Sequence, residues 1–135
     1  MARPNKRQNC TVLVVEDEPV LGMGLTVELE VLGFRIVGRF STYREVMRSL
    51  ASGFPDCAVV DVGLKDGSGF EIARKLRCRG VPMVLLSEAE AFRPEALHEW
   101  RETPWVGRPV AAAHLAHILD GLARLRGQWP RERAA

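Results

Sequence analysis

The chain has 135 residues, of which 47% are hydrophobic and 27% are charged, and its formal net charge is +2. This length suits one domain that buries its own core, and the composition is ordinary for a soluble globular protein. The small net charge gives no reason to expect direct binding of nucleic acid. We see no signal peptide and no apolar run near the ~20 residues of a membrane helix, so we expect no membrane association.

The three cysteines, Cys10, Cys57 and Cys78, are odd in number and match no metal-binding spacing. Cys10 and Cys57 stand at the starts of apolar segments, where small buried thiols are common. This usage suits a reducing compartment, so we expect a cytoplasmic protein without a disulfide framework.

The first part of the chain predicts a tail, a strand and a helix. Residues 1–9 are polar and basic, and we expect a flexible tail. Residues 11–15 are β-branched or aliphatic, which predicts a fully buried strand. Pro19 fits the first turn of a helix and Gly33 its left-handed end. The expected inward face of this helix comprises Leu21, Leu25, Leu29 and Leu32.

A second strand over 35–38 and a second helix follow. Thr42 and Glu45 have the spacing of a capping box at the start of this helix, and Gly53 ends it. Its expected inward residues are Val46, Met47 and Leu50. The apolar residues 57–60 then predict a third, central strand.

The third helix is predicted to start at a second capping box, Ser68 and Glu71, and to end at Gly80. Its expected buried residues are Phe70, Ala73 and Leu76. Residues 82–86 predict a fourth strand that Ser87 closes. The acidic, alanine-rich residues 88–100 predict a loop and then a short helix.

Residues 105–107 predict a short fifth strand, which leads through Arg108 and Pro109 into the last helix. The expected apolar side of that helix comprises Leu115, Ile118, Leu119, Leu122 and Leu125. We expect one folded domain over 10–126 and a flexible tail over 127–135. Apolar strands that alternate with helices predict an α/β fold with a doubly wound parallel sheet, whose ligands bind at the carboxyl ends of the strands.

Polar residues follow four of the predicted strands, at that same edge of the sheet. They are Glu16 and Asp17 after the first strand, Asp61 at the end of the third, Ser87 after the fourth and Arg108 after the fifth. Three carboxylates in one place repel one another unless a cation lies between them, and Mg²⁺ prefers such oxygen ligands. An Asp61 oxygen would then attack phosphorus, with Arg108 and Ser87 holding phosphoryl oxygens. Taken alone, Asp61 is equally well explained as a strand-ending residue that caps the next loop.

From about Thr11 to Leu125 the sequence resembles a response-regulator receiver domain of two-component signalling. The segments that carry the resemblance are Val-Leu-Val-Val-Glu-Asp-Glu-Pro at 12–19 and Val-Val-Asp-Val-Gly-Leu-Lys-Asp-Gly at 59–67. Ser87 matches the Thr/Ser switch position, Arg108-Pro109 the Lys-Pro pair, and Trp105 the aromatic switch residue. The resemblance implies a flavodoxin-like (βα)5 fold with five parallel strands in the order 2-1-3-4-5.

The resemblance also implies how the site works. Asp61 accepts a phosphoryl group from a histidine kinase or a phosphotransfer protein. Asp17, Asp61 and the backbone carbonyl of Gly63 bind Mg²⁺ directly, and Glu16 acts through water. Ser87 and Trp105 carry the change to the face made by the fourth helix, the fifth strand and the fifth helix.

Two departures from the family pattern concern the same site. Arg108 replaces the family's lysine, and a forked guanidinium is not equivalent to an ammonium group. It either binds phosphoryl oxygens bidentately or turns away and weakens switching. The acidic segment Glu88-Ala89-Glu90-Ala91 replaces small residues, and we expect Glu88 to face solvent.

Three hypotheses follow. The first is a stand-alone phosphorylated receiver, a signalling switch rather than an enzyme. The second is a pseudo-receiver that binds partners without phosphorylation. The third is a magnesium-dependent phosphohydrolase or flavodoxin-type binder, which the absence of a Gly-rich loop and Gly63 in place of a second aspartate disfavour. Because only ten residues follow Leu125, we expect output through protein contact, to a downstream effector, a phosphotransfer protein or a second copy in a homodimer.

Overall fold

Strands and helices alternate along the chain in the computed structural model, which describes residues 6–88 and 94–126. The strands are β1 Thr11–Val15, β2 Arg35–Phe40, β3 Cys57–Asp61, β4 Met83–Ser87 and β5 Trp105–Gly107. The helices are the 3₁₀ helix η1 Lys6–Asn9, then α1 Pro19–Val31, α2 Tyr43–Leu50, α3 Gly69–Cys78, α4 Pro94–Glu99 and α5 Ala112–Arg126.

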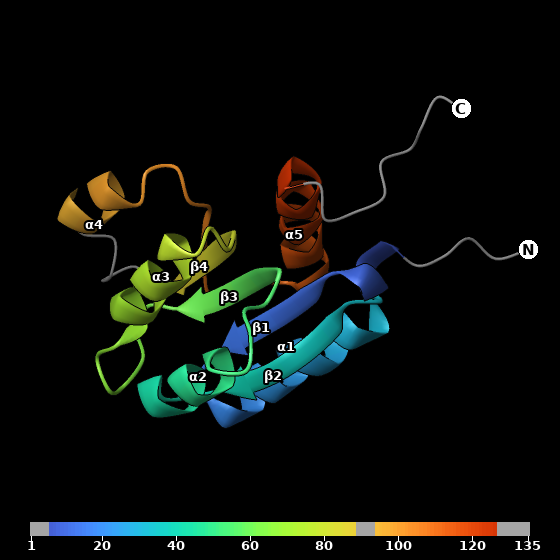
Figure 1. Cartoon of the computed structure of the whole chain (residues 1–135), viewed down its shortest axis with the longest axis horizontal. Helices are drawn as coiled ribbons and strands as arrows, with labels where there is room; N and C mark the ends of the chain where they lie inside the picture. Colours follow the sequence, from blue (N-terminus) through green and yellow to red (C-terminus); the bar gives the residue numbers. More distant parts are fainter. Residues whose placement is uncertain (1–5, 89–93, 127–135) are drawn as a thin grey trace, which may run out of the picture.

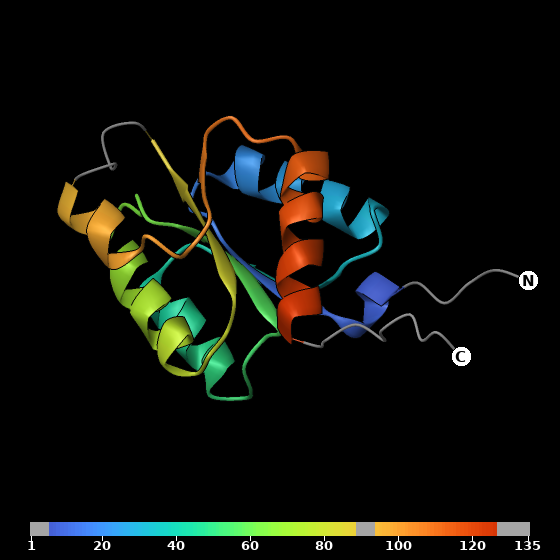
Figure 2. The ribbon, with the colours of Figure 1, turned by 90° about the horizontal axis from the view of Figure 1, so that it is seen from above.

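The five strands form one parallel sheet in the order β2-β1-β3-β4-β5. Figures 1 and 2 show α1 and α5 on one face of the sheet and α2, α3 and α4 on the other. Alternate residues of the central strands enter the two cores: Val12, Val14 and Val59 lie under α1 and α5, while Val15 and Val60 lie under α2 and α3. The predicted doubly wound sheet is confirmed, including its strand order.

The start and the end of α1 follow from its sequence. Pro19 occupies the first turn, and Gly33 follows the helix with a φ of 104°, a conformation that glycine adopts without strain. The prediction of the inward face was wrong at Leu21, which is 53% exposed, and the buried residues of α1 are Gly22, Leu25 and Leu29. The first turn of α1 projects beyond the carboxyl edge of the sheet, so Leu21 lines a surface pocket there instead of the core.

One of the two predicted capping boxes is present. The Thr42 hydroxyl accepts a hydrogen bond from the Glu45 amide at the start of α2, as predicted. Ser68 precedes α3 but makes no side-chain cap, so that prediction was wrong. The backbone of Ser68, with φ of −98° and ψ of 3°, lacks the extended conformation of a capping residue, and its hydroxyl donates to Asp66 Oδ1 at 2.5 Å.

The last helix differs from its prediction at one end. Leu115 and Leu119 are fully buried, whereas Leu125 is 84% exposed. Ala123 supplies the buried position of the last turn, and at 100° per residue Leu125 points about 200° away from it.

The segment expected to be a flexible tail is in part a folded element. Residues Lys6–Asn9 form η1, and Arg7 makes two hydrogen bonds to the carboxylate of Asp120 in α5. Arg7 also donates to the carbonyl of Leu32 and lies over the ring of Phe34 at 4.9 Å. Residues 1–5 and 127–135 and the predicted acidic segment from Ala89 to Ala91 lie outside the described residues.

Over 6–88 and 94–126 the structure contains no helix of the length and apolarity that crossing a membrane requires. Cytoplasmic location stays a prediction.

Candidate functional site

Asp61 is the last residue of β3 and is only 3% exposed. Its Oδ1 accepts a hydrogen bond of 2.8 Å from the backbone N–H of Gly63. A buried carboxylate requires partners for all its oxygens or a counter-charge. The strand end and this turn therefore hold the side chain in one orientation.

Glu16 and Asp17 follow β1, next to β3 in the sheet. Glu16 is 2% exposed, and its Oε1 accepts a hydrogen bond of 3.0 Å from the Glu18 amide. Asp17 Oδ2 accepts one of 2.7 Å from the Lys65 amide, which ties the end of β1 to the loop after β3. This role of Lys65 was not predicted, because a backbone donor leaves no signal in the side-chain pattern.

The structure brings these three predicted carboxylates together. Glu16, Asp17 and Asp61 each offer an oxygen, and the three oxygens all lie within 4.8 Å of one another. Carboxylate oxygens at this spacing are the donor type that Mg²⁺ prefers. The donor set therefore fits a divalent cation.

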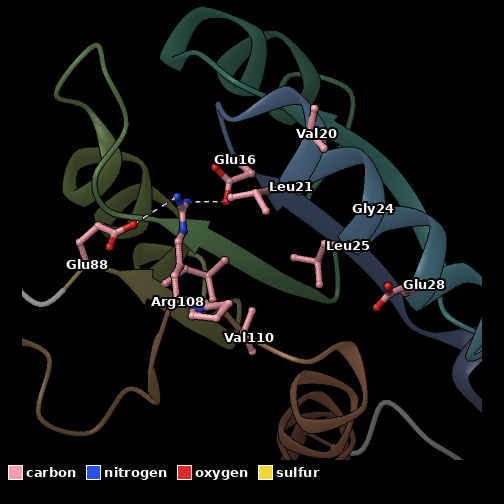
Figure 3. Close-up of a pocket in the computed structure, with 11 residues that line it drawn as sticks. Glu16, Val20, Leu21, Gly24, Leu25, Glu28, Glu88, Arg108 and Val110 are labelled. Atoms are coloured by element: carbon pink, nitrogen blue, oxygen red, sulfur yellow. Dashed lines mark hydrogen bonds and ion pairs between the residues drawn. The ribbon is translucent and has the colours of Figure 1, made fainter.

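Arg108 already supplies positive charge at this site. Its Nη2 lies 2.5 Å from Asp61 Oδ2 and donates to Glu16 Oε2 as well (Figure 3 draws the contact with Glu16). The Arg108 Nε is buried and has no hydrogen-bond partner among the described residues. Arg108 directly follows β5, and the peptide bond from Arg108 to Pro109 is cis. Arg108 therefore turns into the site, and the alternative that it turns away is not observed.

The titration behaviour of this cluster reflects its burial. Burial raises the pKa of Glu16 and the charge of Asp61 adds to this, while the Glu18 amide and Arg108 act in the opposite direction. Burial disfavours the charged form of Arg108, but Asp61 and then Glu16 outweigh it and raise the Arg108 pKa. Arg108 thus acts as the counter-ion of the two buried carboxylates.

The two predicted switch residues lie on β4 and β5. Ser87 is fully buried, and its hydroxyl donates to the carbonyl of Glu88 at 2.8 Å. Trp105 is half-buried, and its Nε1 donates to the carbonyl of Trp100 at 3.1 Å. The Trp105 ring lies 6.1 Å from the ring of Phe70, so the aromatic side chain rests on α3.

A pocket of about 420 Å³ opens beside Arg108 (Figure 3). It lies between the start of α1 and the segment after β5, and residues such as Val20, Leu21 and Val110 line it. The Glu88 side chain, at the rim, is 63% exposed and 3.9 Å from Arg108 Nη1. The prediction that Glu88 faces solvent is confirmed.

Comparison with known proteins agrees with the fold. The model of the response regulator receiver domain matches residues 12–102. The chain belongs to this family. Receiver domains are signalling modules of response regulators.

Solved structures and sequence relatives agree with this assignment. The receiver domain of a modulated diguanylate cyclase from Desulfovibrio desulfuricans superposes with a TM-score of 0.77 at 25% identity, over 87% of this chain and 96% of that one. The probable transcriptional regulatory protein TcrX of Mycobacterium tuberculosis is 37% identical over 89 residues, or 62% of this chain and 36% of TcrX. The KDP operon transcriptional regulatory protein KdpE of Escherichia coli is 38% identical over 77 residues, covering 56% of this receiver and 34% of KdpE. The receiver thus spans about a third to a half of the length of these and other curated relatives.

Proposed function

We propose that this receiver domain accepts a phosphoryl group on Asp61 and passes the signal on through protein contact. The observation that carries the proposal is the burial of Asp61 at the carboxyl end of β3, within 4.8 Å of carboxylate oxygens of Glu16 and Asp17. A loop-capping role for Asp61 alone does not account for three convergent carboxylates, because Arg108 offsets their mutual repulsion only in part.

Asp17 and Asp61 would hold Mg²⁺ directly, together with the Gly63 carbonyl, and Glu16 would act through water. A bound Mg²⁺ supplies positive charge that neutralises phosphoryl oxygens. The chain's own contribution is orientation: the Gly63 amide holds Asp61 Oδ1, which leaves Oδ2 to react.

In the transfer step, Asp61 Oδ2 attacks the phosphorus of a phosphohistidine or an acyl phosphate. The new O–P bond forms as the bond from phosphorus to the donor breaks, and the donor leaves with that electron pair. For a phosphohistidine, the imidazole then takes up a proton from water. Arg108 lies where Oδ2 must react, so its guanidinium has to move from the carboxylate to the phosphoryl oxygens.

The same contact favours one competing function. Since Arg108 pairs with both Asp61 and Glu16, its single positive charge offsets part of the negative charge of the two carboxylates. A pseudo-receiver, which binds partners in one fixed state, would have this arrangement.

The exposed face of α1 is a candidate docking surface for a partner protein. Its outer face exposes an apolar stripe of Val20, Met23, Val27 and Val31, whose exposures run from 52% to 81%. The helix contains no lysine or arginine, while Glu28 and Glu30 flank the stripe. We propose that the stripe docks a protein phosphodonor whose apolar helix face is flanked by basic residues, because Val20 also lines the pocket beside Arg108.

The first experiment measures intact mass after incubation with Mg²⁺ and acetyl phosphate. We expect one phosphoryl adduct in the parent and none in Asp61→Asn. An adduct that persists in Asp61→Asn would contradict the site. If neither protein forms an adduct, the parent is treated with beryllofluoride, a phosphoryl mimic that is not hydrolysed. A change in Trp105 fluorescence would then indicate rapid hydrolysis of the phosphoryl group, and no change would indicate a pseudo-receiver.

A second experiment separates docking from chemistry. Val27 is 52% exposed on α1 and does not line the pocket. The variant Val27→Glu should therefore be labelled by acetyl phosphate as readily as the parent. Transfer from a phosphorylated histidine phosphotransfer domain should fall at least tenfold, about 1.4 kcal/mol. Equal loss with both donors would place the effect on the fold rather than on docking.

A further inference from the structure

Two thiols touch inside the core at the end of the sheet remote from Asp61. The Sγ atoms of Cys10 and Cys57 lie 3.4 Å apart, and both residues are fully buried. Cys10 immediately precedes β1 and Cys57 begins β3, the two strands that pair in parallel at the centre of the sheet. A disulfide requires an S–S distance of about 2.05 Å, so the two sulfurs need to approach by only about 1.4 Å.

The backbone around Cys10 is placed to allow this approach. Cys10 lies outside the β1 ladder and directly after η1. Its amide donates a hydrogen bond of 3.1 Å to the carbonyl of Arg7 in η1. Cys57, by contrast, is fixed in β3 opposite Val12. A small shift of the segment at Cys10 therefore closes the gap without disturbing the sheet.

Access to the pair is controlled by η1. The ion pair from Arg7 to Asp120 and the hydrogen bond from Gln8 to the Gly33 carbonyl hold η1 against α1 and α5. Local opening of a short terminal element costs much less than global unfolding. Opening of η1 would expose Cys10 to a small oxidant while the rest of the core stays closed.

We propose that Cys10 and Cys57 form a reversible intramolecular disulfide on exposure to a hydroperoxide. The contact with Cys57 lowers the pKa of the Cys10 thiol against the opposing effect of burial, which favours Cys10 as the attacking thiolate.

The reaction is balanced as follows. The Cys10 thiolate attacks the peroxide, the O–O bond breaks, and one water leaves as Cys10 becomes a sulfenic acid. The Cys57 sulfur then attacks the Cys10 sulfur, the S–O bond breaks, and a second water leaves with the remaining thiol proton. Overall, two thiols are oxidised to one disulfide and one hydrogen peroxide is reduced to two waters.

The test uses the full chain with Cys78→Ser, because Cys78 is exposed and would form intermolecular disulfides. The reduced protein is treated with hydrogen peroxide, denatured and alkylated, and its intact mass is measured. We expect a species that is lighter by two hydrogens, takes up no alkyl group and reverts with dithiothreitol. Peptide mapping should join the peptides of Cys10 and Cys57, and Cys10→Ser should abolish the species.

Two further readouts follow from the structure. The crosslink closes a loop over 47 positions of sequence, so the oxidised form should melt higher by roughly 10 °C. Arg7→Ala should oxidise several-fold faster than the parent, since it removes the ion pair that holds η1. The proposal is wrong if both thiols remain alkylatable in the parent and in Arg7→Ala, or if oxidation stops at a sulfinic acid on one cysteine.

Discussion

A single guanidinium nitrogen of Arg108 faces the carboxylates of both Asp61 and Glu16, and all three side chains are largely buried. Removing one partner of such a cluster leaves charges that neither water nor protein compensates. The arginine therefore holds the two carboxylates together, and under the proposed function it has to leave Asp61 Oδ2 for the phosphoryl group to bind there.

Arg108→Gln should lower the free energy of unfolding by about 3 kcal/mol in the absence of divalent cations. Added Mg²⁺ should recover most of this loss, since the cation then compensates the same carboxylates. The measurement is urea unfolding with and without Mg²⁺ at constant ionic strength. Arg108→Lys, which keeps the charge, is the control; an equal loss with and without Mg²⁺ would mean that the two cations do not compete.

Gly69, the first residue of α3, lies against the strand end that carries Asp61. A Cβ there would come within 2.5 Å of Val62 Cα and 2.6 Å of the Asp61 carbonyl oxygen. Gly69→Ala should therefore destabilise the fold by about 2 kcal/mol, because backbone has to move. Gly121 lies in α5 with no described atom within 4 Å of its Cβ position, so Gly121→Ala should add about 1 kcal/mol. Both are measured by thermal and urea unfolding, and similar effects at the two sites would contradict this packing.

At the scale of elements, α2 is held by a side-chain cap. Thr42 accepts a hydrogen bond from the Glu45 amide, and Glu45 accepts in return from the Ser41 amide and hydroxyl. Thr42→Ala should lower the free energy of unfolding by about 1 kcal/mol, whereas Thr42→Ser keeps the acceptor and should cost much less. Equal losses in urea unfolding would indicate that the methyl group, not the cap, matters.

The loop between β3 and α3 is tied to the start of α2 by Asp66. Its carboxylate accepts hydrogen bonds from the Ser68 hydroxyl and the amides of Tyr43 and Ser68. The Ser68 hydroxyl is the main cause of an Asp66 pKa below its usual value. Because the folded state binds the proton more weakly than the unfolded state, this stabilisation is present above about pH 4 and is lost as the pH falls through the folded-state pKa.

Asp66→Asn should therefore be less stable than the parent at pH 7 by roughly 0.5 kcal/mol, a small value because solvent screens the exposed carboxylate. The difference should shrink toward zero below about pH 3. Urea midpoints at pH 7, 5 and 3 test this, with Glu71→Gln on the exposed side of α3 as a charge-matched control. If the difference in stability between Asp66→Asn and the parent is the same at all three pH values, the charge of Asp66 is not its cause.

At the scale of the whole molecule, the sequence was sufficient for the order of elements and for the edge where the carboxylates meet. Strand ends in a parallel sheet share one edge, so Glu16, Asp17 and Asp61 were placed together by topology alone. The periodicity of α1 was less informative. The spacing of apolar residues identifies the face of a helix that packs on the sheet, but not which of its turns extends beyond the sheet, and Leu21 is therefore exposed. The inward turn of Arg108 depends on buried charge in three dimensions, which no linear pattern records.

The ion pair between Arg7 and Asp120 has a practical consequence for anyone who wishes to observe this receiver at work. It joins η1 to α5 near the edge of the sheet at which the strands begin (Figures 1 and 2), while Asp61 ends β3 at the opposite edge. A spectroscopic label on exposed Arg124, near that ion pair, would leave the approach to Asp61 unobstructed. Under the proposed function, such a label would leave the carboxyl edge of the sheet open to a phosphodonor.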